Sequence, residues 1–229
     1  MSMDLKGKVV LVTGAGGSLG SATALALARA GASVVLLGKT IRRLEQVYDD
    51  ILAAGGPEPA LYPLDLAGAR EDDYLELAST LWRELGRLDG LIHAAAEMTY
   101  LSPLEQITES ALERSLKVNL TAPTVMTWAL LHMLTATRGT VIFITDSGAR
   151  NGLAYWGPYA IAKAGLEKAA ALFKHEHEGT VAVHLYEPGP MASRLRRKAF
   201  PGESGADLKS PDACAACLLD LLISPDGEA

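Results

Sequence analysis

Short apolar runs of strand length alternate with amphipathic helical segments along almost the whole chain. The runs are rich in Val, Ile and Leu, as is typical of strands buried on both faces of a parallel sheet. The segments between them carry apolar residues at helical spacing. Such alternation requires right-handed crossovers and predicts an α/β fold: a doubly wound parallel sheet of about six strands with helices on both faces. The expected strands are residues 8–13, 33–38, 59–66, 88–96, 139–145 and 180–189. The expected helices are residues 18–32, 41–56, 71–86, 109–134 and 210–223. A further helix, which carries Tyr159 and Lys163, is expected to end near residue 177.

No internal repeat, low-complexity tract or linker divides this pattern. The 229 residues are enough for one sizeable core. With 49% apolar and 21% charged residues, the chain does not have the composition of a disordered protein. We therefore expect a single domain spanning residues 1–229.

The charge balance argues against a nucleic-acid partner. The formal net charge is −6 and the pI is near 5.4, whereas affinity for phosphate backbones needs clustered Lys and Arg. The one basic cluster, "RLRRK" at residues 194–198, is interpreted as a solvated helix face or as a neighbour of an anionic cofactor.

Cysteine usage and the N-terminus predict a cytoplasmic protein. Cys214 and Cys217 lie in a helical segment with no second pair to complete a metal site, so we interpret them as small packing residues in a reducing compartment. The stretch "KHEHE" at 174–178 lacks a third ligand, and no metal is expected. We find no apolar run of signal-peptide or membrane-span length and expect no membrane partner.

A glycine-rich loop, "TGAGGSLG" at residues 13–20, joins the first expected strand to the first expected helix. Glycines let backbone N–H groups approach a pyrophosphate, and a helix N-terminus favours negative charge. Tight turns also need glycine for purely conformational reasons. Placed between a buried strand and a helix, the loop indicates a Rossmann-like nucleotide-binding fold.

From Lys6 to nearly its C-terminus the chain resembles the classical short-chain dehydrogenases/reductases. Thr13, Gly14 and Gly20 match the family's T-G-x-x-x-G-x-G loop, with Ser18 where the middle glycine belongs. "PGPMAS" at 188–193 matches the family's P-G-x-x-x-T, with serine for threonine. The resemblance implies hydride transfer between a nicotinamide cofactor and an alcohol or carbonyl.

Residues at the end of the second strand favour NADP over NAD. Family members that use NAD place an acidic residue there for the ribose 2′-hydroxyl, whereas this chain has Gly38 and Lys39, followed by Arg42 and Arg43. An ammonium group pairs with a 2′-phosphate. A solvated loop lysine is the alternative interpretation of Lys39, and NAD remains an alternative cofactor.

Other positions correspond to the cofactor contacts of the family. Asp65 matches an aspartate that contacts adenine, although it equally fits an N-cap of the next helix. The family's N-N-A-G is replaced by "HAAA" at 93–96, which removes a bracing asparagine, and His93 is expected to be buried in packing. The cofactor-binding residues implied by the resemblance are Gly14, Ser18, Leu19, Gly20, Lys39, Asp65, Leu66, Ala94, Ala95, Tyr159, Lys163, Pro188, Gly189 and Ser193.

The segment "YWGPYAIAKAG" carries the candidate catalytic pair. Tyr159 and Lys163 stand at i and i+4 on one helix face, where an ammonium group can act on a phenol. In the family this Tyr is the acid/base and this Lys also holds the nicotinamide ribose. Asn119 matches the family Asn that supports a water beside the Lys; otherwise it is an isolated polar residue that needs a partner.

The family serine falls thirteen positions before the tyrosine, where this chain has Asp146, with Ser147 next. Either a one-residue loop shift brings Ser147 into the site, which is the simpler change, or Asp146 fills the position. An ionised carboxylate there opposes alkoxide formation, while a protonated one can donate a hydrogen bond.

The sequence thus predicts an NADP-preferring oxidoreductase acting on a small or medium, fairly apolar molecule. Trp156, Met191 and Leu195 are expected at the substrate pocket. The alternative is a catalytically weak nucleotide-binding or scaffold protein that keeps the fold. A homodimer or higher homo-oligomer is expected through the long helices that hold Asn119 and Tyr159.

Overall fold

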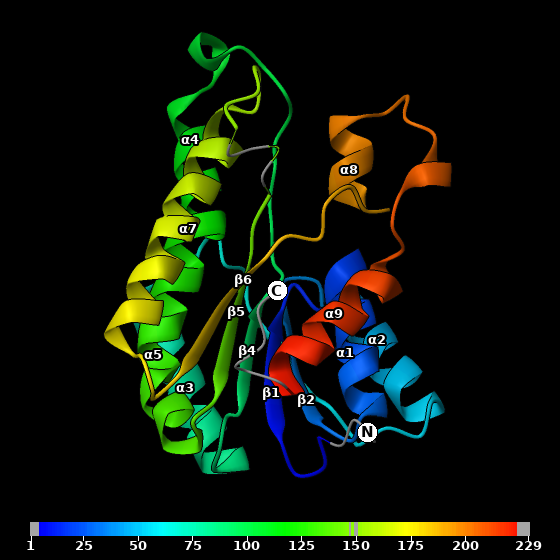
Figure 1. Ribbon diagram of the computed structural model, residues 1–229, viewed down its shortest axis with the longest axis vertical. Coiled ribbons are helices and arrows are strands. Elements are labelled where there is room, and N and C mark those ends of the chain that lie inside the picture. Colours follow the sequence, from blue (N-terminus) through cyan, green and yellow to red (C-terminus); the bar gives the residue numbers. More distant parts are fainter. Residues whose placement is uncertain (1–4, 147, 149–150, 224–229) are drawn as a thin grey trace.

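A six-stranded, fully parallel sheet forms the centre of the computed structural model, which describes residues 5–146, 148 and 151–223 (Figure 1). The strands lie in the order β3-β2-β1-β4-β5-β6, so the order reverses between β1 and β4. Their bounds are β1 Val9–Thr13, β2 Ser33–Gly38, β3 Ala60–Pro63, β4 Gly90–His93, β5 Thr140–Ile144 and β6 Ala182–Tyr186. The predicted doubly wound fold with six strands is confirmed.

Helices cover both faces of this sheet (Figure 1). On one face lie α1 (Ser18–Arg29), α2 (Ile41–Ala53) and α9 (Pro211–Ile223). On the other lie α3 (Glu71–Leu85), α4 (Glu109–Leu116), α5 (Ala122–Thr137) and α7 (Gly157–Glu176). Short elements η1 (Leu104–Gln106), η2 (Lys117–Thr121), α8 (Arg194–Ala199) and η3 (Gly205–Asp207) complete the described chain.

Strand β1 shows why an uninterrupted apolar run fits this sheet. All five of its residues are buried. Leu11 belongs to the core beneath α3, α5 and α7, while Val10 and Val12 belong to the core beneath α1, α2 and α9. Because successive side chains point to opposite faces, both faces of the strand must be apolar.

The helix expected over residues 109–134 is interrupted by a π-helical turn and extends further. This turn, η2, spans Lys117–Thr121, and α5 continues to Thr137. Pro123 has no N–H to bond to the carbonyl four residues earlier, so regular α-helical bonding cannot continue through this region. The turn displaces the register of the helix at Asn119, and such π-turns are frequent at functional sites.

Several expected strands end earlier than predicted because their last residues leave the sheet. Residues 64–66, 94–96 and 187–189 follow β3, β4 and β6 as irregular chain. These segments lie at the carboxyl edge of the sheet, where they line the cavity described below. The sequence pattern does not distinguish the last residues of a strand from residues that follow the strand and line the cavity.

The two cysteines behave differently from the prediction. Cys214 is buried in the core beneath α1 and α9, whereas Cys217 is exposed, because the helix turns it away from that core. Both are free thiols. In the described part of the chain no three His, Cys, Asp or Glu side chains cluster as metal ligands. None of the helices in residues 5–146, 148 and 151–223 has the length and apolarity needed to cross a bilayer.

Candidate active site

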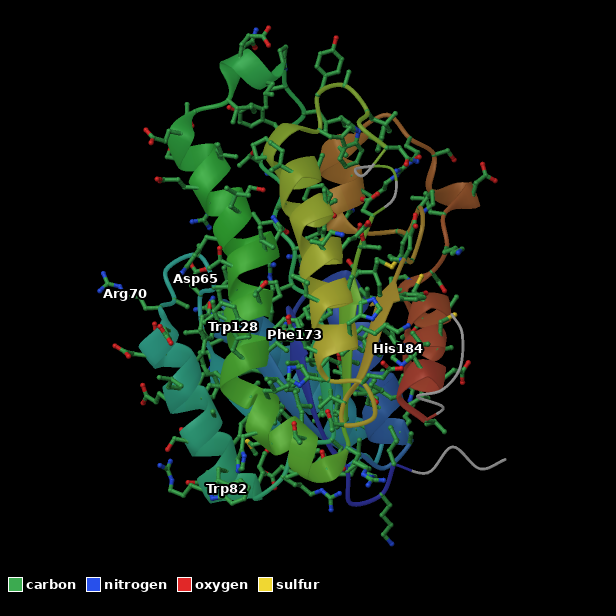
Figure 2. The ribbon with its side chains drawn as sticks, turned by 60° about the vertical axis from the view of Figure 1, so that its left-hand side comes forward. Asp65, Arg70, Trp82, Trp128, Phe173 and His184 are labelled. Carbon is green, nitrogen blue, oxygen red and sulfur yellow. The ribbon has the colours of Figure 1, made fainter. Side chains whose placement is uncertain are left out.

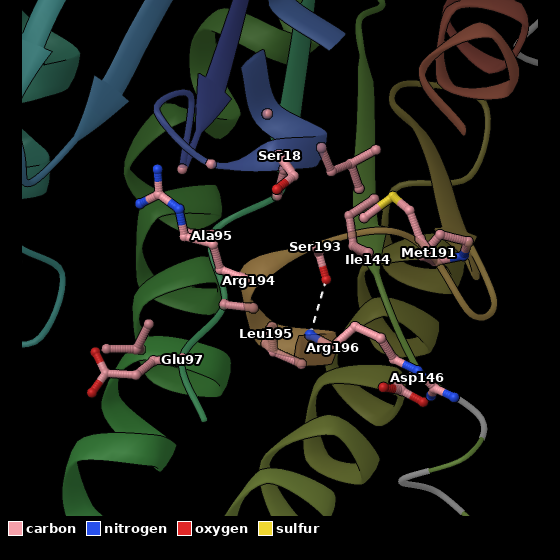
Figure 3. Close-up of a pocket in the computed structure, with 18 of the residues that line it drawn as sticks. Ser18, Ala95, Glu97, Ile144, Asp146, Met191, Ser193, Arg194, Leu195 and Arg196 are labelled. Carbon is pink, nitrogen blue, oxygen red and sulfur yellow. Dashed lines mark hydrogen bonds between the residues drawn. The ribbon is translucent and has the colours of Figure 1, made fainter. Parts of the chain in front are cut away.

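A cavity of about 660 Å³ opens at the carboxyl edge of the sheet, above the point where the strand order reverses. Ligands of doubly wound folds bind at this edge. The cavity runs from the glycine loop to α8, and its lining includes Trp156, Met191 and Leu195 (Figure 3). Of the predicted cofactor and catalytic residues, the lining includes Gly14, Ser18, Leu19, Gly20, Lys39, Asp65, Leu66, Ala94, Ala95, Asp146, Tyr159, Lys163, Pro188, Gly189 and Ser193. Asn119 lies outside this lining, and Ser147 falls outside the described residues.

The glycine loop packs so tightly that two of its glycines have no room for a side chain. A Cβ on Gly14, whose φ is +66°, would lie 2.7 Å from the Cα of Ala95. A Cβ on Gly20 would lie 2.2 Å from the carbonyl oxygen of Gly14. Gly17 precedes α1 without a side-chain cap, so the first N–H groups of that helix are available to an anion. Ser18 fits at the start of α1 and still lines the cavity.

The far end of the cavity carries both positive and negative charge. Lys39 and Arg43 line it, whereas Arg42 does not. A carboxylate also stands here: the Nζ of Lys39 lies 3.7 Å from Glu97, which forms a further ion pair with Arg114. Sequence reasoning missed Glu97, since it follows β4 and lies 58 positions from Lys39, as their residue numbers show.

Two hydrogen-bonded links replace the bracing asparagine that "HAAA" lacks. The N–H of Ala95 donates to the Thr13 hydroxyl at 3.1 Å and joins the ends of β1 and β4. Asn119, which is buried, accepts from the N–H of Glu97 at 3.0 Å and donates to its carbonyl at 2.7 Å. It also donates to the Ser115 carbonyl. The observed contacts of Asn119 therefore fix the chain after β4 to η2, and no described bond joins it to Lys163.

His93 lies in the core, as expected. Its Nε2 is 2.9 Å from the hydroxyl of Thr127, and its ring stacks on Phe143. Burial, with a smaller contribution from the charge of Lys163, lowers the pKa of His93 to about 3. The side chain is therefore neutral at physiological pH.

Tyr159 and Lys163 project from α7 towards the carboxyl end of β5. Tyr159 is 5% exposed and Lys163 is 2% exposed. The Nζ of Lys163 donates to the carbonyl of Ile144 at 2.7 Å and lies 5.6 Å from the centre of the Tyr159 ring. Burial lowers the pKa of Lys163 to about 8, against the opposing charges of Asp146 and Glu167.

Asp146 stands directly against the candidate catalytic tyrosine. Burial raises the pKa of Tyr159, and the charge of Asp146 and a hydrogen bond between the two side chains raise it further. The phenol is therefore the donor and the carboxylate the acceptor. Asp146 also acts on the guanidinium of Arg196, which lies beside it in Figure 3. The structure thus places a hydrogen-bond acceptor, and not a donor, against the Tyr159 hydroxyl.

Helix α8 closes one side of the cavity. Ser193 caps it by accepting from the N–H of Arg196 at 3.0 Å, so its hydroxyl has a structural partner (Figure 3). Lys198 donates to the carbonyl of Met98 at 2.7 Å and ties α8 to the chain after β4. The basic cluster is therefore helical, as expected, and it borders the cavity through Arg194 and Arg196.

An apolar wall lies between α8 and the tyrosine. Met98, Trp156, Tyr159 and Ala199 form a buried cluster against which Leu101, Ala160, Leu195 and Phe200 pack. The ring centres of Trp156 lie 5.9 Å from Tyr159 and 6.0 Å from Phe200. This wall gives the inner end of the cavity a largely apolar surface.

The remaining predicted residues lie at turns. Asp65 is not the N-cap of α3, which begins after Arg70; its carboxylate instead accepts from the N–H of Ala67 at 3.1 Å and stabilises the turn at the cavity edge. Gly189 has a φ of +69°, which explains the Pro188-Gly189 turn after β6.

The fold and cavity define a Rossmann-type nucleotide-binding protein with a Tyr–Lys pair at the end of the nucleotide cleft. A profile of the short chain dehydrogenase family matches residues 8–204, and the chain belongs to this family of oxidoreductases. An oxidoreductase of Escherichia coli (strain K12), YciK, is 32% identical over 208 residues, covering 90% of this chain and 82% of its own.

Solved structures agree with this assignment. A short chain dehydrogenase from Pseudomonas syringae superimposes with a TM-score of 0.93 at 37% identity, covering 99% of this chain and 92% of that one. Another from Escherichia coli CFT073, complexed with NADPH, gives a TM-score of 0.94 at 30% identity, covering 99% and 95%. The predicted family and fold are confirmed, and NAD(P) binding is supported.

Proposed function

We propose that this protein is an NADP(H)-preferring reductase or dehydrogenase that interconverts an alcohol and a carbonyl on a small or medium, apolar molecule. The observation that carries the proposal is the single cavity that joins the glycine loop to Tyr159 and Lys163. The NADPH complex of the similar Escherichia coli CFT073 protein supports the choice of cofactor.

The residues present fit a nicotinamide dinucleotide. The closely packed Gly14 and Gly20 and the uncapped start of α1 suit a pyrophosphate, and Lys39 and Arg43 suit a 2′-phosphate. When bound, the cofactor supplies or accepts the hydride. Lys163 is assigned to hold the nicotinamide ribose.

Tyr159 is assigned the proton transfer. Its hydroxyl holds the proton that the substrate oxygen gains on reduction. Burial and Asp146 both raise the pKa of Tyr159, so the phenol is protonated throughout the neutral range and is ready to act as an acid. The Lys163 ammonium, whose Nζ lies 5.6 Å from the centre of the Tyr159 ring, favours the phenolate that remains after transfer.

The apolar wall supports an apolar substrate. Leu195 and Phe200 belong to the α8 segment, and Trp156 lies beside Tyr159 at the start of α7. A substrate oriented with its reacting carbon at Tyr159 would bury hydrocarbon surface against these three side chains.

A cofactor-oxidation screen tests the proposed function. Purified protein and NADPH are incubated with a panel of ketones, aldehydes and quinones, and the Tyr159→Phe variant serves as the control for each hit. Turnover that depends on Tyr159 is expected for at least one apolar carbonyl. Cofactor binding without any such turnover would favour the alternative, a nucleotide-binding or scaffold protein.

Removing the charge of Lys39 is expected to weaken NADPH binding and leave NADH binding unchanged. The side chain is 55% exposed and already has Glu97 near it, so an exposed pair worth about 0.2–1 kcal/mol predicts a loss of about 1.4- to 5-fold for Lys39→Ala. Arg42→Ala, an exposed residue outside the cavity lining, is the control. Titration calorimetry with both cofactors measures the effect, and equal losses for NADPH and NADH would contradict it.

We also propose that the protein is a cytoplasmic, single-domain homodimer. The exposed Trp128 on α5, with Ile161 and Leu172 on α7, places apolar surface on the two long helices, and Figure 2 shows Trp128 on the outer side of α5. The two free cysteines suit a reducing compartment.

Introducing a charge on α5 should therefore disrupt the dimer. Trp128→Lys is expected to sediment as a monomer at concentrations where the wild type is a dimer. Leu52→Lys, an exposed apolar residue of α2 on the opposite face of the sheet, should leave the dimer intact. Sedimentation velocity distinguishes the two, and a monomeric wild type would contradict the proposed assembly.

A further inference from the structure

Three side chains at four-residue intervals on α7 meet the carboxyl end of β5. Tyr159, Lys163 and Glu167 share one face of the helix because residues four apart are neighbours. Each contacts one of the successive residues 144–146: Lys163 bonds the first through its carbonyl, Glu167 the second and Tyr159 the third. Glu167 is the member of this series that the sequence did not single out.

The carboxylate of Glu167 is held in one place. Thr145, which is 4% exposed, donates a hydrogen bond from its hydroxyl to Oε1 of Glu167. Glu167 is itself half-buried and does not line the cavity. Its negative charge is therefore held outside the cavity lining and acts on the Lys163 ammonium group.

The Lys163 ammonium needs this charge because it is almost completely removed from water. Desolvation favours the neutral amine, whereas nearby anions and the hydrogen bond to the Ile144 carbonyl favour the ammonium group. The titratable groups that face Lys163 among the described residues are Asp146, Glu167, Tyr159 and His93. His93 and Tyr159 are neutral near pH 7, because their pKa values are lowered and raised respectively. Two carboxylates thus stabilise the ammonium.

The carboxylates of Asp146 and Glu167 differ in their position relative to the cavity. Asp146 lines the cavity and bonds Tyr159, so its contribution to Lys163 changes when a substrate binds there. Glu167 does not itself line the cavity, and its carboxylate accepts from the Thr145 hydroxyl. It therefore supplies its charge to Lys163 from outside the cavity lining.

We propose that Glu167 is a positioning residue of this site: the charge of its carboxylate, four residues along α7 from the buried Lys163, keeps that side chain an ammonium group directed at the carboxyl end of β5. The inference rests on the proposed function only in assigning Lys163 a role in that site.

Two single substitutions separate the effect of the Glu167 charge from the effect of its hydrogen bond to Thr145. Glu167→Gln removes the charge but keeps an oxygen that can accept from Thr145. Thr145→Val removes the hydrogen bond but keeps the charge. Glu176→Gln, at the exposed end of the same helix, is the control for loss of a carboxylate from α7.

The primary measurement is the titration of Lys163 by NMR of protein labelled with ¹³C at the lysine ε-carbon. Its signal is assigned by its absence from Lys163→Arg. This readout needs neither cofactor nor substrate, so it stands even if the proposed function fails. Thermal unfolding of each variant shows which of them remain folded.

Glu167→Gln is expected to lower the midpoint of the Lys163 titration by about one pH unit, because it removes an opposite charge that acts on the buried ammonium group. Thr145→Val and Glu176→Gln are expected to leave the midpoint close to that of the wild type. Because the ammonium of the variant is lost at lower pH, its affinity for NADPH should fall about five- to tenfold at pH 8.5 and less than twofold at pH 6.5.

Two outcomes would overturn the inference. One is a Lys163 midpoint that is the same in Glu167→Gln and the wild type. The other is an equal shift in Glu167→Gln and Thr145→Val, which would assign the effect to the hydrogen bond and not to the charge. If Glu167→Gln does not fold, Glu167→Asp and Glu167→Ala replace it, and the midpoint must remain lower in Ala than in Asp.

Discussion

Tyr159→Phe is expected to lower turnover by about 10²- to 10⁴-fold, which is the usual contribution of a positioned acid or base. The change removes only the hydroxyl. The ring keeps its packing against Trp156, and Lys163 keeps its separate bond to the Ile144 carbonyl. The dissociation constant for NADPH should therefore change less than twofold. Steady-state kinetics on a substrate from the screen and a fluorescence titration of NADPH measure the two quantities.

Lys163→Ala is the informative comparison for this variant. We expect it to reduce both turnover and NADPH affinity, because the ammonium group acts on the phenol and is also assigned to the ribose. If Tyr159→Phe kept most of its activity on every substrate, Tyr159 would not be the acid and the proposed mechanism would be wrong.

The fold was predictable from sequence because its determinants are local. In β1, each of five consecutive positions is buried, so the apolar run itself indicates a strand that is covered on both faces. Gly20 is another local determinant, since a Cβ there would collide with the carbonyl oxygen of Gly14 in the same loop. The proximity of Tyr159 and Lys163 is likewise local, because residues four apart on a helix lie on the same face.

The electrostatics of the site were much less predictable because they depend on contacts between distant segments. Glu97 approaches Lys39 only because the chain after β4 passes beside the end of β2. Asn119 meets Glu97 from a π-turn that apolar periodicity does not reveal. Glu167 looks like an ordinary polar helix residue until the fold brings Thr145 to it. In each case the partner is set by tertiary packing and not by sequence spacing.

Asp146 is the charged residue that acts directly on Tyr159. Its carboxylate accepts from the Tyr159 hydroxyl and raises the pKa of Tyr159, which makes the phenol a weaker acid. A negative charge there also opposes the negative charge that develops on a carbonyl oxygen during reduction. Replacing this carboxylate with a neutral hydrogen-bond donor should therefore speed reduction.

Asp146→Ser is accordingly expected to raise the rate of carbonyl reduction at neutral pH. Serine restores a donor, and the loss of the charge lowers the pKa of Tyr159 towards its ordinary value. Ser147→Ala should then have little effect on the rate.

If Ser147 instead serves as the donor, Ser147→Ala lowers the rate of reduction and Asp146→Ser leaves it nearly unchanged. A donor to a developing oxyanion is worth about 10²- to 10³-fold in turnover, so the two cases are well separated. Steady-state pH profiles of both variants decide between them, with Tyr159→Phe as the baseline. The observed contact of Asp146 with Tyr159 favours the first outcome, and unchanged profiles in both variants would exclude this segment from the mechanism.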